Sequence, residues 1–499
     1  MARDTGNGTE KTVNTTPGTA GNCGSDTSAP HGATLDKKFK AICALDGRYS
    51  KIEEMLYPYF SEFALQKARV FVEVNWLIFL IDNIKIPALE CFGDADIFDI
   101  EKIASSFDED AFTRVKEIES TTNHDVKACE FFVDEKLDEM GYGELKSFVH
   151  FGLTSEDVTN LSYARLIEAF LRELYVPTLE ELITDIGKKA IKYAGTPMLA
   201  HTHGQAATPT TVGKEFAVYV HRLSNEFSSI ENPIILGKIN GATGNYSAMS
   251  FAFPEYDWEK LAFEFVESVI GVWFNPATTQ IESHDYVATI LDNVAHINNI
   301  IRDLDLDMWT YISRGYFKLK KKDNEVGSST MPHKVNPIDF ENSEGNIKIG
   351  NPLCRAFSDE LTRSREQRDL SDSTVQRNLG LCFGYSIQAM LSTMKGLSKS
   401  VVNEDAVAAD LENNWAVLAE PIQQVLRKYG ISDAYNQLKA LTRGREISKE
   451  DIHSFIETLD VLSADDKERL LKLTPSTYTG YAQKIAVECV CEHLGENFE

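Results

Sequence analysis

The chain has 499 residues, a length that predicts two or three domains rather than one. Hydrophobic residues make up 43% of the sequence and charged residues 25%, which is typical of a soluble globular protein. The formal net charge of −26 argues against nucleic acid and against an anionic membrane surface as partners, because both are bound by basic surfaces.

The first 34 residues differ in composition from the rest. Residues 1–34 are rich in Gly, Thr, Ser and Asn and almost lack large apolar side chains, which predicts a disordered extension. This extension has neither the apolar stretch of a secretory signal nor the charge of a transit peptide. Eight cysteines are scattered without a Cys-x-x-Cys pair, so we expect free thiols and a cytoplasmic protein. No apolar run approaches the roughly 20 residues of a membrane helix.

Helical periodicity dominates the rest of the chain and predicts an all-α fold. It is clearest in residues 277–314, which contain neither glycine nor proline and carry apolar residues at alternating spacings of four and three. Such a 3.5-residue repeat predicts a long helix in a bundle that is shared between subunits. Further helices are expected at residues 161–194 with a kink at Pro177, at 213–230 and at 346–363. Short apolar stretches at 234–236 and 269–274 are the sparse signals for strands.

These patterns divide the chain into a disordered extension and three helical domains. We expect an N-terminal helical domain at residues 35–145, a central helical bundle at 146–397 and a C-terminal helical domain at 398–499. Within the last domain, residues 449–473 and 477–493 are predicted to form a closing helical hairpin.

Several polar motifs interrupt the helical pattern. Residues 121–125 (Thr-Thr-Asn-His-Asp) and 154–157 (Thr-Ser-Glu-Asp) are each explained as a helix start, and the second has the spacing of a capping box. Free N–H groups at a helix start also suit a carboxylate or a phosphate. Residues 201–205 (His-Thr-His-Gly-Gln) offer a histidine to protonate a departing nitrogen. No further ligand at a suitable spacing supports a metal site here, so no metal is expected.

The most informative motif is residues 327–337, which read Gly-Ser-Ser-Thr-Met-Pro-His-Lys-Val-Asn-Pro. Serine is a feeble base, and it removes a proton only where positive charge and N–H donors stabilise its alkoxide. Lys334, six residues after Ser328, and the backbone of this loop would supply both. The lysine-rich residues 315–327 before it are predicted to form a mobile lid. Residues 363–377 carry four arginines, the side chain suited to carboxylate and phosphate recognition.

Residues 327–337 resemble the signature of the fumarase/aspartase superfamily, whose members eliminate fumarate from succinyl-type substrates. Their extension through residue 346, together with motifs from residues 46–49 (Asp-Gly-Arg-Tyr) to 442–444 (Thr-Arg-Gly), is similar to the bacterial-type adenylosuccinate lyases. The resemblance implies a three-domain fold with a central long-helix bundle and a homotetramer in which three chains build each active site. It also implies nucleotide substrates, namely adenylosuccinate and the succinylated aminoimidazole carboxamide ribotide, with no metal and no organic cofactor.

The resemblance also implies roles for individual residues. Ser328 is the general base, His203 is the general acid, and Lys334 stabilises the carbanion. Glu341 orients a histidine, and His124 has a supporting role, although the division of roles between His124 and His203 stays open. Another lyase of the superfamily, such as argininosuccinate lyase, and a catalytically silent crystallin-like scaffold are the alternatives. Residues implied in substrate binding are Arg48, Tyr49, Asn123, Asp125, Thr154, Ser155, Gln280, Ser329, Asn336, Asn342, Arg368, Ser373, Thr374 and Arg377.

Overall fold

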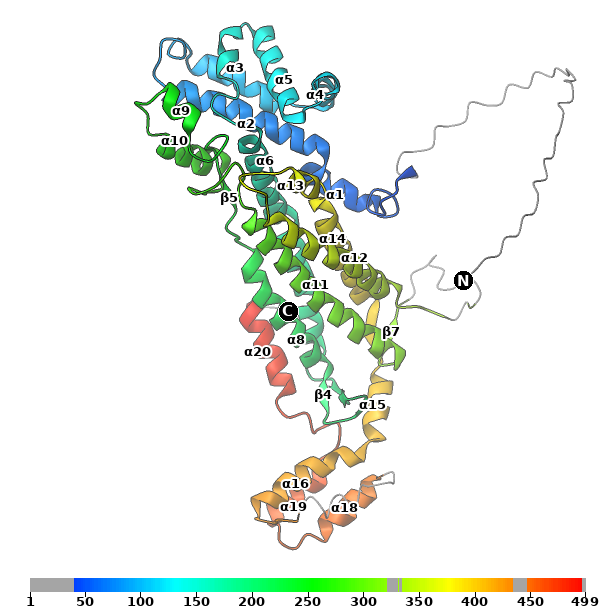
Figure 1. Ribbon diagram of the computed structural model, residues 1–499. Coiled ribbons are helices and arrows are strands. Elements are labelled where there is room, and N and C mark those ends of the chain that lie inside the picture. Colours follow the sequence, from blue (N-terminus) through cyan, green and yellow to red (C-terminus); the bar gives the residue numbers. More distant parts are fainter. Residues whose placement is uncertain (1–39, 321–330, 332–333, 434–446, 496–499) are drawn as a thin grey trace, which may run out of the picture.

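The computed structural model describes residues 40–320, 331, 334–433 and 447–495. The predicted disordered extension lies outside the described residues, as do Ser328, Ser329 and most of the predicted lid. Regular structure in the described part is helical apart from short two-stranded pairs, so the predicted all-α class is confirmed. The molecule is elongated, with long helices running between two smaller helical ends (Figure 1).

One end of the molecule is built around helix α2, which buries side chains along most of its length. The hydroxyl of Ser61 caps this helix by accepting the N–H of Ala64 at 3.0 Å. Helices α3, α5 and α6 pack against α2. The helices of this end are α1 (Ser50–Phe60), α2 (Glu62–Asn83), α3 (Asp94–Ser105), α4 (Glu109–Thr122), α5 (Asp125–Met140) and the 3-10 helix η2 (Gly143–Phe148).

The centre is a bundle of long helices in which α11 packs on α12 and α8, and α12 packs on α14. Pro177 lies in the first turn of α7, where its missing N–H costs no hydrogen bond, and a π-helical segment precedes it. Where the sequence predicted a kink, the structure therefore has a π-helical segment just before Pro177. The bundle helices are α6 (Ser155–Phe170), η3 (Leu171–Tyr175), α7 (Val176–Lys192), α8 (Val212–Ile230), α11 (Asp285–Ser313), α12 (Ile338–Leu361) and α14 (Leu379–Lys399).

Helix boundaries agree with the predictions to different degrees. Helix α8 begins one residue before the predicted start and ends at the predicted residue. Helix α11 begins at Asp285 rather than at residue 277, because His284 has a left-handed backbone conformation with φ of 58°. Helix α12 begins at Ile338, eight residues before the predicted start. Asp339 and Glu341 in its first turn interact favourably with the positive end of the helix dipole.

Short strands and turns connect the long helices. The strands β1 (Pro197–Met198) and β4 (Thr210–Thr211) pair antiparallel, as do β2 (His201–Thr202) with β3 (Gln205–Ala206), and β7 (Phe317–Leu319) with β8 (Ser400–Val402). The two apolar stretches predicted as strands pair with each other in parallel as β5 (Leu236–Gly237) and β6 (Trp273–Phe274). The remaining connections contain α9 (Ser247–Ala252), α10 (Trp258–Glu264), the π-helix η4 (Phe265–Ile270) and α13 (Ser371–Gln376).

The other end of the molecule has a small hydrophobic core of its own, which includes Trp415, Ile422 and Ile452. The predicted hairpin of residues 449–473 with 477–493 is wrong. Helices α18 and α19 pack on each other, whereas α20 packs on α7 and α8 and adds Ala486 and Val490 to the main core. The elements of this end are α15 (Glu404–Glu412), η5 (Trp415–Leu418), α16 (Ala419–Lys428), α18 (Lys449–Glu457) and α19 (Ala464–Lys472), followed by α20 (Ala482–Leu494).

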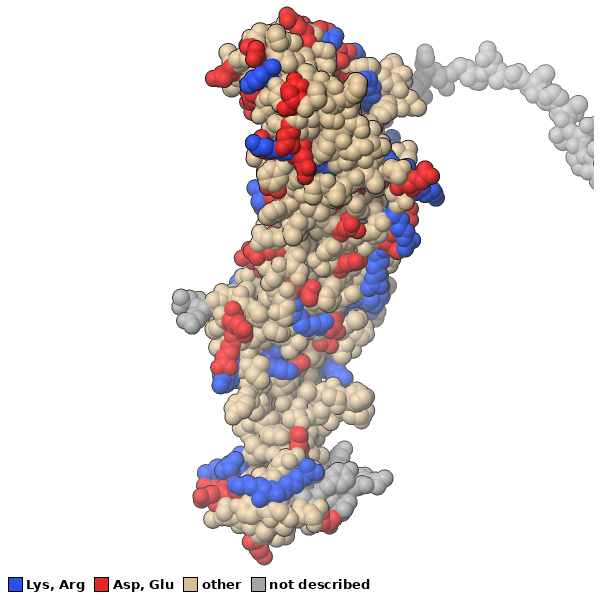
Figure 2. Space-filling view, turned by 60° about the vertical axis from the view of Figure 1, so that its left-hand side comes forward, with Lys and Arg blue, Asp and Glu red and all other residues tan. Residues whose placement is uncertain are grey.

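The surface mixes charged and apolar side chains. On the face in Figure 2, acidic and basic residues are interspersed, and broad uncharged areas separate them. Large apolar side chains are exposed on three bundle helices, among them Val218, Leu306, Trp309 and Ile349. Among the described helices, none has both the length and the apolar character that crossing a bilayer requires.

Asp305 is an acidic residue buried in the bundle, with 1% of its surface exposed. It lies on α11, and its Oδ1 accepts a hydrogen bond at 2.8 Å from the hydroxyl of Thr393 on α14. Burial raises the pKa of Asp305 to about 8, and the hydroxyls of Ser343 and Thr393 offset only part of that rise. The folded state therefore holds a proton that the unfolded chain releases in the same pH range.

We predict that Asp305→Asn removes a pH dependence of stability. Because the pKa of Asp305 is raised in the folded state, its neutral form stabilises the fold at low pH, and stability falls as the pH rises from about 4 to about 8. The variant loses this slope, which amounts to about 1.4 kcal/mol per pH unit for one group. Urea midpoints across this range measure it, with Asp303→Asn, at an exposed position of the same helix, as the control. Parallel curves for wild type and Asp305→Asn would contradict the prediction.

Candidate active site

The predicted site residues that the structure describes lie in three places. The arginine group, where α5, α6 and α13 meet, comprises Asn123, His124, Asp125, Thr154, Ser155, Gln280, Arg368, Ser373, Thr374 and Arg377. The α12 group, around the start of α12, comprises Arg48, Tyr49, Lys334, Asn336, Glu341 and Asn342. The histidine hairpin, β2–β3, carries His203.

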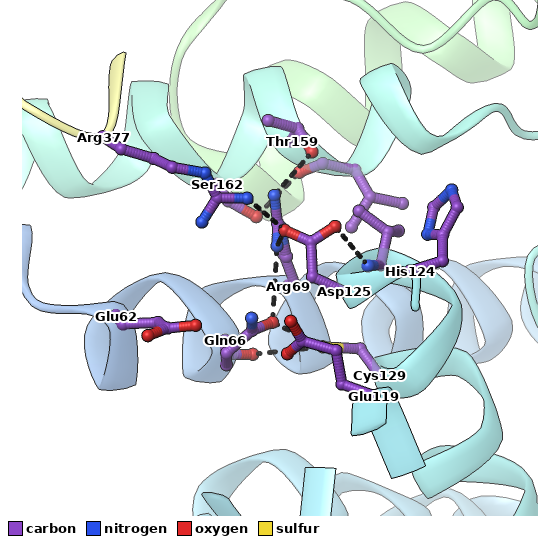
Figure 3. Close-up of polar contacts among 12 residues, drawn as sticks. Glu62, Gln66, Arg69, Glu119, His124, Asp125, Cys129, Thr159, Ser162 and Arg377 are labelled. Atoms are coloured by element: carbon purple, nitrogen blue, oxygen red, sulfur yellow. Dashed lines mark hydrogen bonds and ion pairs between the residues drawn. The ribbon is translucent and has the colours of Figure 1, made fainter. Parts of the chain in front are cut away.

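In the arginine group, Asp125 lies between two guanidinium groups (Figure 3). Arg69 on α2 donates to Asp125 Oδ2 at 2.6 Å, and Arg377 at the end of α13 donates to the same oxygen. Arg69 also reaches the hydroxyl of Thr159 at 3.3 Å, and only 3% of its side chain is exposed. Burial alone would raise the pKa of Asp125, but the two arginines lower it well below its usual value. Asp125 is thus ionised and fixes the position of Arg377.

The predicted helix-start role of residues 121–125 is confirmed. Asn123 ends α4 in a left-handed conformation with φ of 53°, and His124 caps α5 by accepting the N–H of Lys127 at Nδ1 over 3.1 Å. The His124 ring is exposed and points away from the two guanidinium groups in Figure 3. The cap fixes the Nδ1 side of the ring and leaves its Nε2 side facing outwards.

Arg368 connects two predicted substrate-binding segments. Its Nη1 donates to Gln280 Oε1 at 3.2 Å, and its Nη2 lies 3.3 Å from Glu156 Oε2. Gln280 in turn donates to the carbonyl of Ala242 at 2.8 Å. The structure therefore brings together Gln280 and Arg368, which lie 88 residues apart in the sequence.

Behind Arg368 lies a buried cluster that the sequence did not reveal. Glu156, His284 and Asp372 are each at most 4% exposed, and Gln376 lies 2.5 Å from His284 Nε2. Burial raises the pKa of Glu156 to about 8, with Arg368 opposing the rise, and burial lowers the pKa of His284 to about 4. His284 has a positive φ and a short contact with Gln376. This contact joins two segments, the loop that contains Gln280 and the segment that contains Arg368.

A buried ion pair sets the start of α6, where Thr154 and Ser155 lie. Lys238 Nζ lies 2.8 Å from Asp157 Oδ1, and neither side chain is exposed. Asp157 also accepts the N–H of Thr154 at 2.8 Å and the N–H of Asn240 at 3.0 Å. The first of these bonds is half of the predicted capping box. The ion pair therefore positions the free N–H groups of this helix start.

In the α12 group, Asn342 links two segments that lie 293 residues apart. Its amide donates to the hydroxyl of Tyr49 at 2.8 Å, while Arg48 beside it is exposed. Glu341 accepts a hydrogen bond at 3.1 Å from the indole of Trp309 on α11, a partner that the sequence gave no means to identify. Lys334 is exposed where the chain enters α12. The predicted base Ser328 and its neighbour Ser329 lie outside the described residues.

His203 lies at the tip of the histidine hairpin. The turn has φ of 53° at His203 and 75° at Gly204, and the histidine ring is exposed. At the base of the hairpin, His201 lies next to Tyr316, with 6.4 Å between ring centroids. Tyr316 follows the C-terminal end of α11. This contact places the hairpin near that end of the bundle (Figure 1).

The length of α11 separates the histidine hairpin from the arginine group. Gln280 precedes the N-terminal end of α11, and Tyr316 follows its C-terminal end. A helix of 29 residues spans about 43 Å at ~1.5 Å per residue. His203 and the pair formed by Gln280 and Arg368 in one chain are too far apart to contact the same small molecule. One chain therefore does not bring His203 next to Gln280 and Arg368.

We predict that Lys238→Met strongly destabilises the chain. The variant leaves Asp157 buried without its cation, which costs about 3–5 kcal/mol, and displaces the start of α6. Urea unfolding measures the loss. The control is Lys260→Met, because the Lys260 side chain is 69% exposed and lies 3.6 Å from Glu264. That variant should cost less than about 1 kcal/mol. Equal losses in the two variants would show that the buried pair does not hold this region.

Two families match this chain. The one described as Lyase covers residues 47–349, and the one described as Adenylosuccinate lyase C-terminal covers residues 364–479. The adenylosuccinate lyase of Haemophilus influenzae is 47% identical over 446 residues, which are 89% of this chain and 97% of that protein. The adenylosuccinate lyase of Escherichia coli K12 is 47% identical over 443 residues, with the same coverage of both proteins.

Solved structures with low sequence identity share the fold. The 3-carboxy-cis,cis-muconate lactonizing enzyme from Pseudomonas putida is 18% identical with a TM-score of 0.70, and the match covers 89% of this chain and 97% of that one. The fumarate lyase from Mesorhizobium sp. BNC1 is 16% identical with a TM-score of 0.71, covering 88% and 97%. At these identities the likeness concerns the fold alone.

Proposed function

Because this chain belongs to the adenylosuccinate lyase family of the fumarase/aspartase superfamily, we propose that it eliminates fumarate from adenylosuccinate, leaving AMP. We include the succinylated aminoimidazole carboxamide ribotide, which carries the same succinyl group on nitrogen, as a second substrate. The observation that carries the proposal is the contact of Arg368 with Gln280, together with the pairing of Arg377 with Asp125. Guanidinium groups and an amide suit an anionic nucleotide, which needs local positive charge in a protein with a net charge of −26.

The proposed reaction is a β-elimination that starts at Ser328. As an alkoxide, Ser328 removes a proton from the succinyl carbon next to a carboxylate. The electron pair spreads onto that carboxylate as an aci-form dianion, which Lys334, Asn336 and loop N–H groups stabilise. The C–N bond then breaks, His203 gives a proton to the departing nitrogen, and fumarate leaves. None of these steps calls for a metal or an organic cofactor.

The remaining predicted residues hold the substrate in this proposal. Arg368 and Arg377 suit the phosphate and a carboxylate, and Gln280 suits the succinyl group. His124, exposed on the cap of α5, supports the proton transfer, and Glu341 orients a catalytic partner. The other residues that we assign to substrate binding are Arg48, Tyr49, Asn123, Asp125, Thr154, Ser155, Ser329, Asn342, Ser373 and Thr374.

We propose that the active enzyme is a homotetramer in which three chains build each site. The separation of His203 from Arg368 along α11 supports this arrangement. Exposed apolar side chains such as Leu306 and Trp309, which are 44% and 46% exposed, would be buried where bundles meet. The seven described cysteines are free, which suits the reducing cytoplasm that we propose as the compartment.

Replacing the proposed base should abolish turnover without changing assembly. Ser328→Ala lowers kcat by at least about a thousandfold, because no other group removes the proton. The assay follows fumarate in the ultraviolet with adenylosuccinate as substrate and argininosuccinate as the comparison. The control is Ser398→Ala, which removes an exposed hydroxyl bonded to the carbonyl of Lys395. Full turnover in Ser328→Ala would remove this serine from the mechanism, and fumarate released only from argininosuccinate would reject the nucleotide substrate.

Mixing two inactive variants should restore activity. His203→Ala alone and Arg368→Met alone leave no intact site. When the two variants assemble at random, a site is intact if its His203 comes from an Arg368→Met chain and its Arg368 comes from a His203→Ala chain. Equal mixing gives about a quarter of wild-type activity, since each of two chains contributes an intact segment half the time. The variants are denatured and refolded together, and the mixture is compared with each variant refolded alone. Activity that stays at background in the mixture would place both residues in one chain.

A further inference from the structure

Three metal-binding side chains meet where α20 packs on α8, away from the residues of the candidate active site. They are His221 on α8 and Cys489 and His493 on α20. His221 Nδ1 lies 2.8 Å from His493 Nε2, and one ligand atom from each of the three residues lies within 4.8 Å of the others. Neither the relatives' names nor the proposed reaction accounts for this group.

The helices hold these side chains in position. Cys489 and His493 are four residues apart on α20, so they share a face of the helix. The Cys489 sulfur lies 3.3 Å from the carbonyl oxygen of Ala217, which is one turn before His221 on α8. Ala486 and Val490, next to these ligands on α20, are fully buried in the main core. The backbone that presents the three side chains is therefore fixed by packing before any ligand binds.

The donor set is chemically selective. Two imidazole nitrogens and a thiolate are ligands that Zn²⁺ prefers over the oxygen sets used by Mg²⁺ and Ca²⁺. In tetrahedral zinc sites, bonds of about 2.0–2.3 Å place the donor atoms roughly 3.3–3.6 Å apart. The observed separations, from 2.8 Å up to at most 4.8 Å, bracket that value. Small side-chain rotations suffice to admit the ion.

The surroundings of the three ligands also suit a cation. A cavity of about 340 Å³ beside them is lined by Glu488, Glu492 and Lys214, and it has room for a carboxylate or a water as fourth ligand. The charge of Lys214 is paired with Glu215 at 3.2 Å. The side-chain nitrogen of Asn225 lies 3.3 Å from Nε2 of His221, the nitrogen that faces away from His493, and restrains the ring.

We infer that His221, Cys489 and His493 form a Zn²⁺ site that clamps the last helix onto the central bundle. Helix α20 follows the small C-terminal core and packs on α7 and α8, so the ion ties the end of the chain to α8 across that contact. The site is structural in this assignment, because its ligands are not among the residues of the arginine group, the α12 group or the histidine hairpin.

Metal binding by the untagged full-length protein tests the inference. After chelator treatment, Zn²⁺ titrated against a chromophoric chelator should bind at one ion per chain and raise the thermal midpoint. Co²⁺ in its place should give a thiolate-to-metal charge-transfer band and the intense visible bands of a tetrahedral site. Cys489→Ser and His493→Ala should each lower Zn²⁺ affinity at least about tenfold. The controls are Cys491→Ser, two residues from Cys489 but outside the cluster, and His296→Ala, at an exposed position on α11, and neither should change the affinity.

Two results would overturn the inference. One is a Co²⁺ spectrum of the wild-type protein without a thiolate band, which needs no variant and so does not depend on how the variants fold. The other is equal Zn²⁺ binding by wild type and Cys489→Ser, which would leave adventitious surface binding only. Fumarate formation at low temperature should be the same with and without the metal, and this separates a failure of the clamp from a failure of the proposed reaction.

Discussion

The rigid length of α11 is the constraint on which the rest of the molecule depends. Its 29 residues place the loop with Gln280 at one end of the bundle and Tyr316, next to the histidine hairpin, at the other. A helix of this length keeps its two ends apart, and for this reason we propose that residues from different chains combine to complete each site. Burial of the exposed apolar side chains on the same helix would favour association of the chains. In this proposal, assembly and catalysis depend on the same helix.

The arginine group, which we propose as the binding site for the anionic substrate, gathers cations in an acidic protein. Each cation there has a partner that fixes it: Asp125 holds Arg69 and Arg377, and Glu156 faces Arg368. Because Arg377 and Arg368 are only partly exposed, their charge acts in a setting less screened than open water. Lys238 and Asp157, fully buried, set the helix start beside them. The cost of burying Asp125, Lys238 and Asp157 is offset because each has an oppositely charged partner.

Much of the fold follows from periodicity alone, and the errors have local causes. Helix α8 was predicted to within one residue because its apolar stripe is regular along its whole length. The start of α11 was missed by eight residues because His284 adopts a left-handed conformation that no residue-type pattern marks. The hairpin predicted for the last helices failed because helical periodicity reports an apolar face but not the surface that covers it.

The candidate site was predictable where function depends on local motifs. The caps at Asn123–His124 and at Thr154 follow from residue type and spacing, and so does the arginine-rich segment. The partners that hold these motifs, Arg69 and His284, come from distant segments, and their only signal was a charged or polar residue inside an apolar helix or loop.

We propose that each active site combines His203 of one chain with Gln280 and Arg368 of another. The most direct measurement is the structure of the assembled enzyme with AMP and fumarate bound. The account predicts that the His203 ring next to a ligand and the Gln280 amide next to the same ligand belong to different subunits. Finding both side chains from a single chain on one ligand would contradict it.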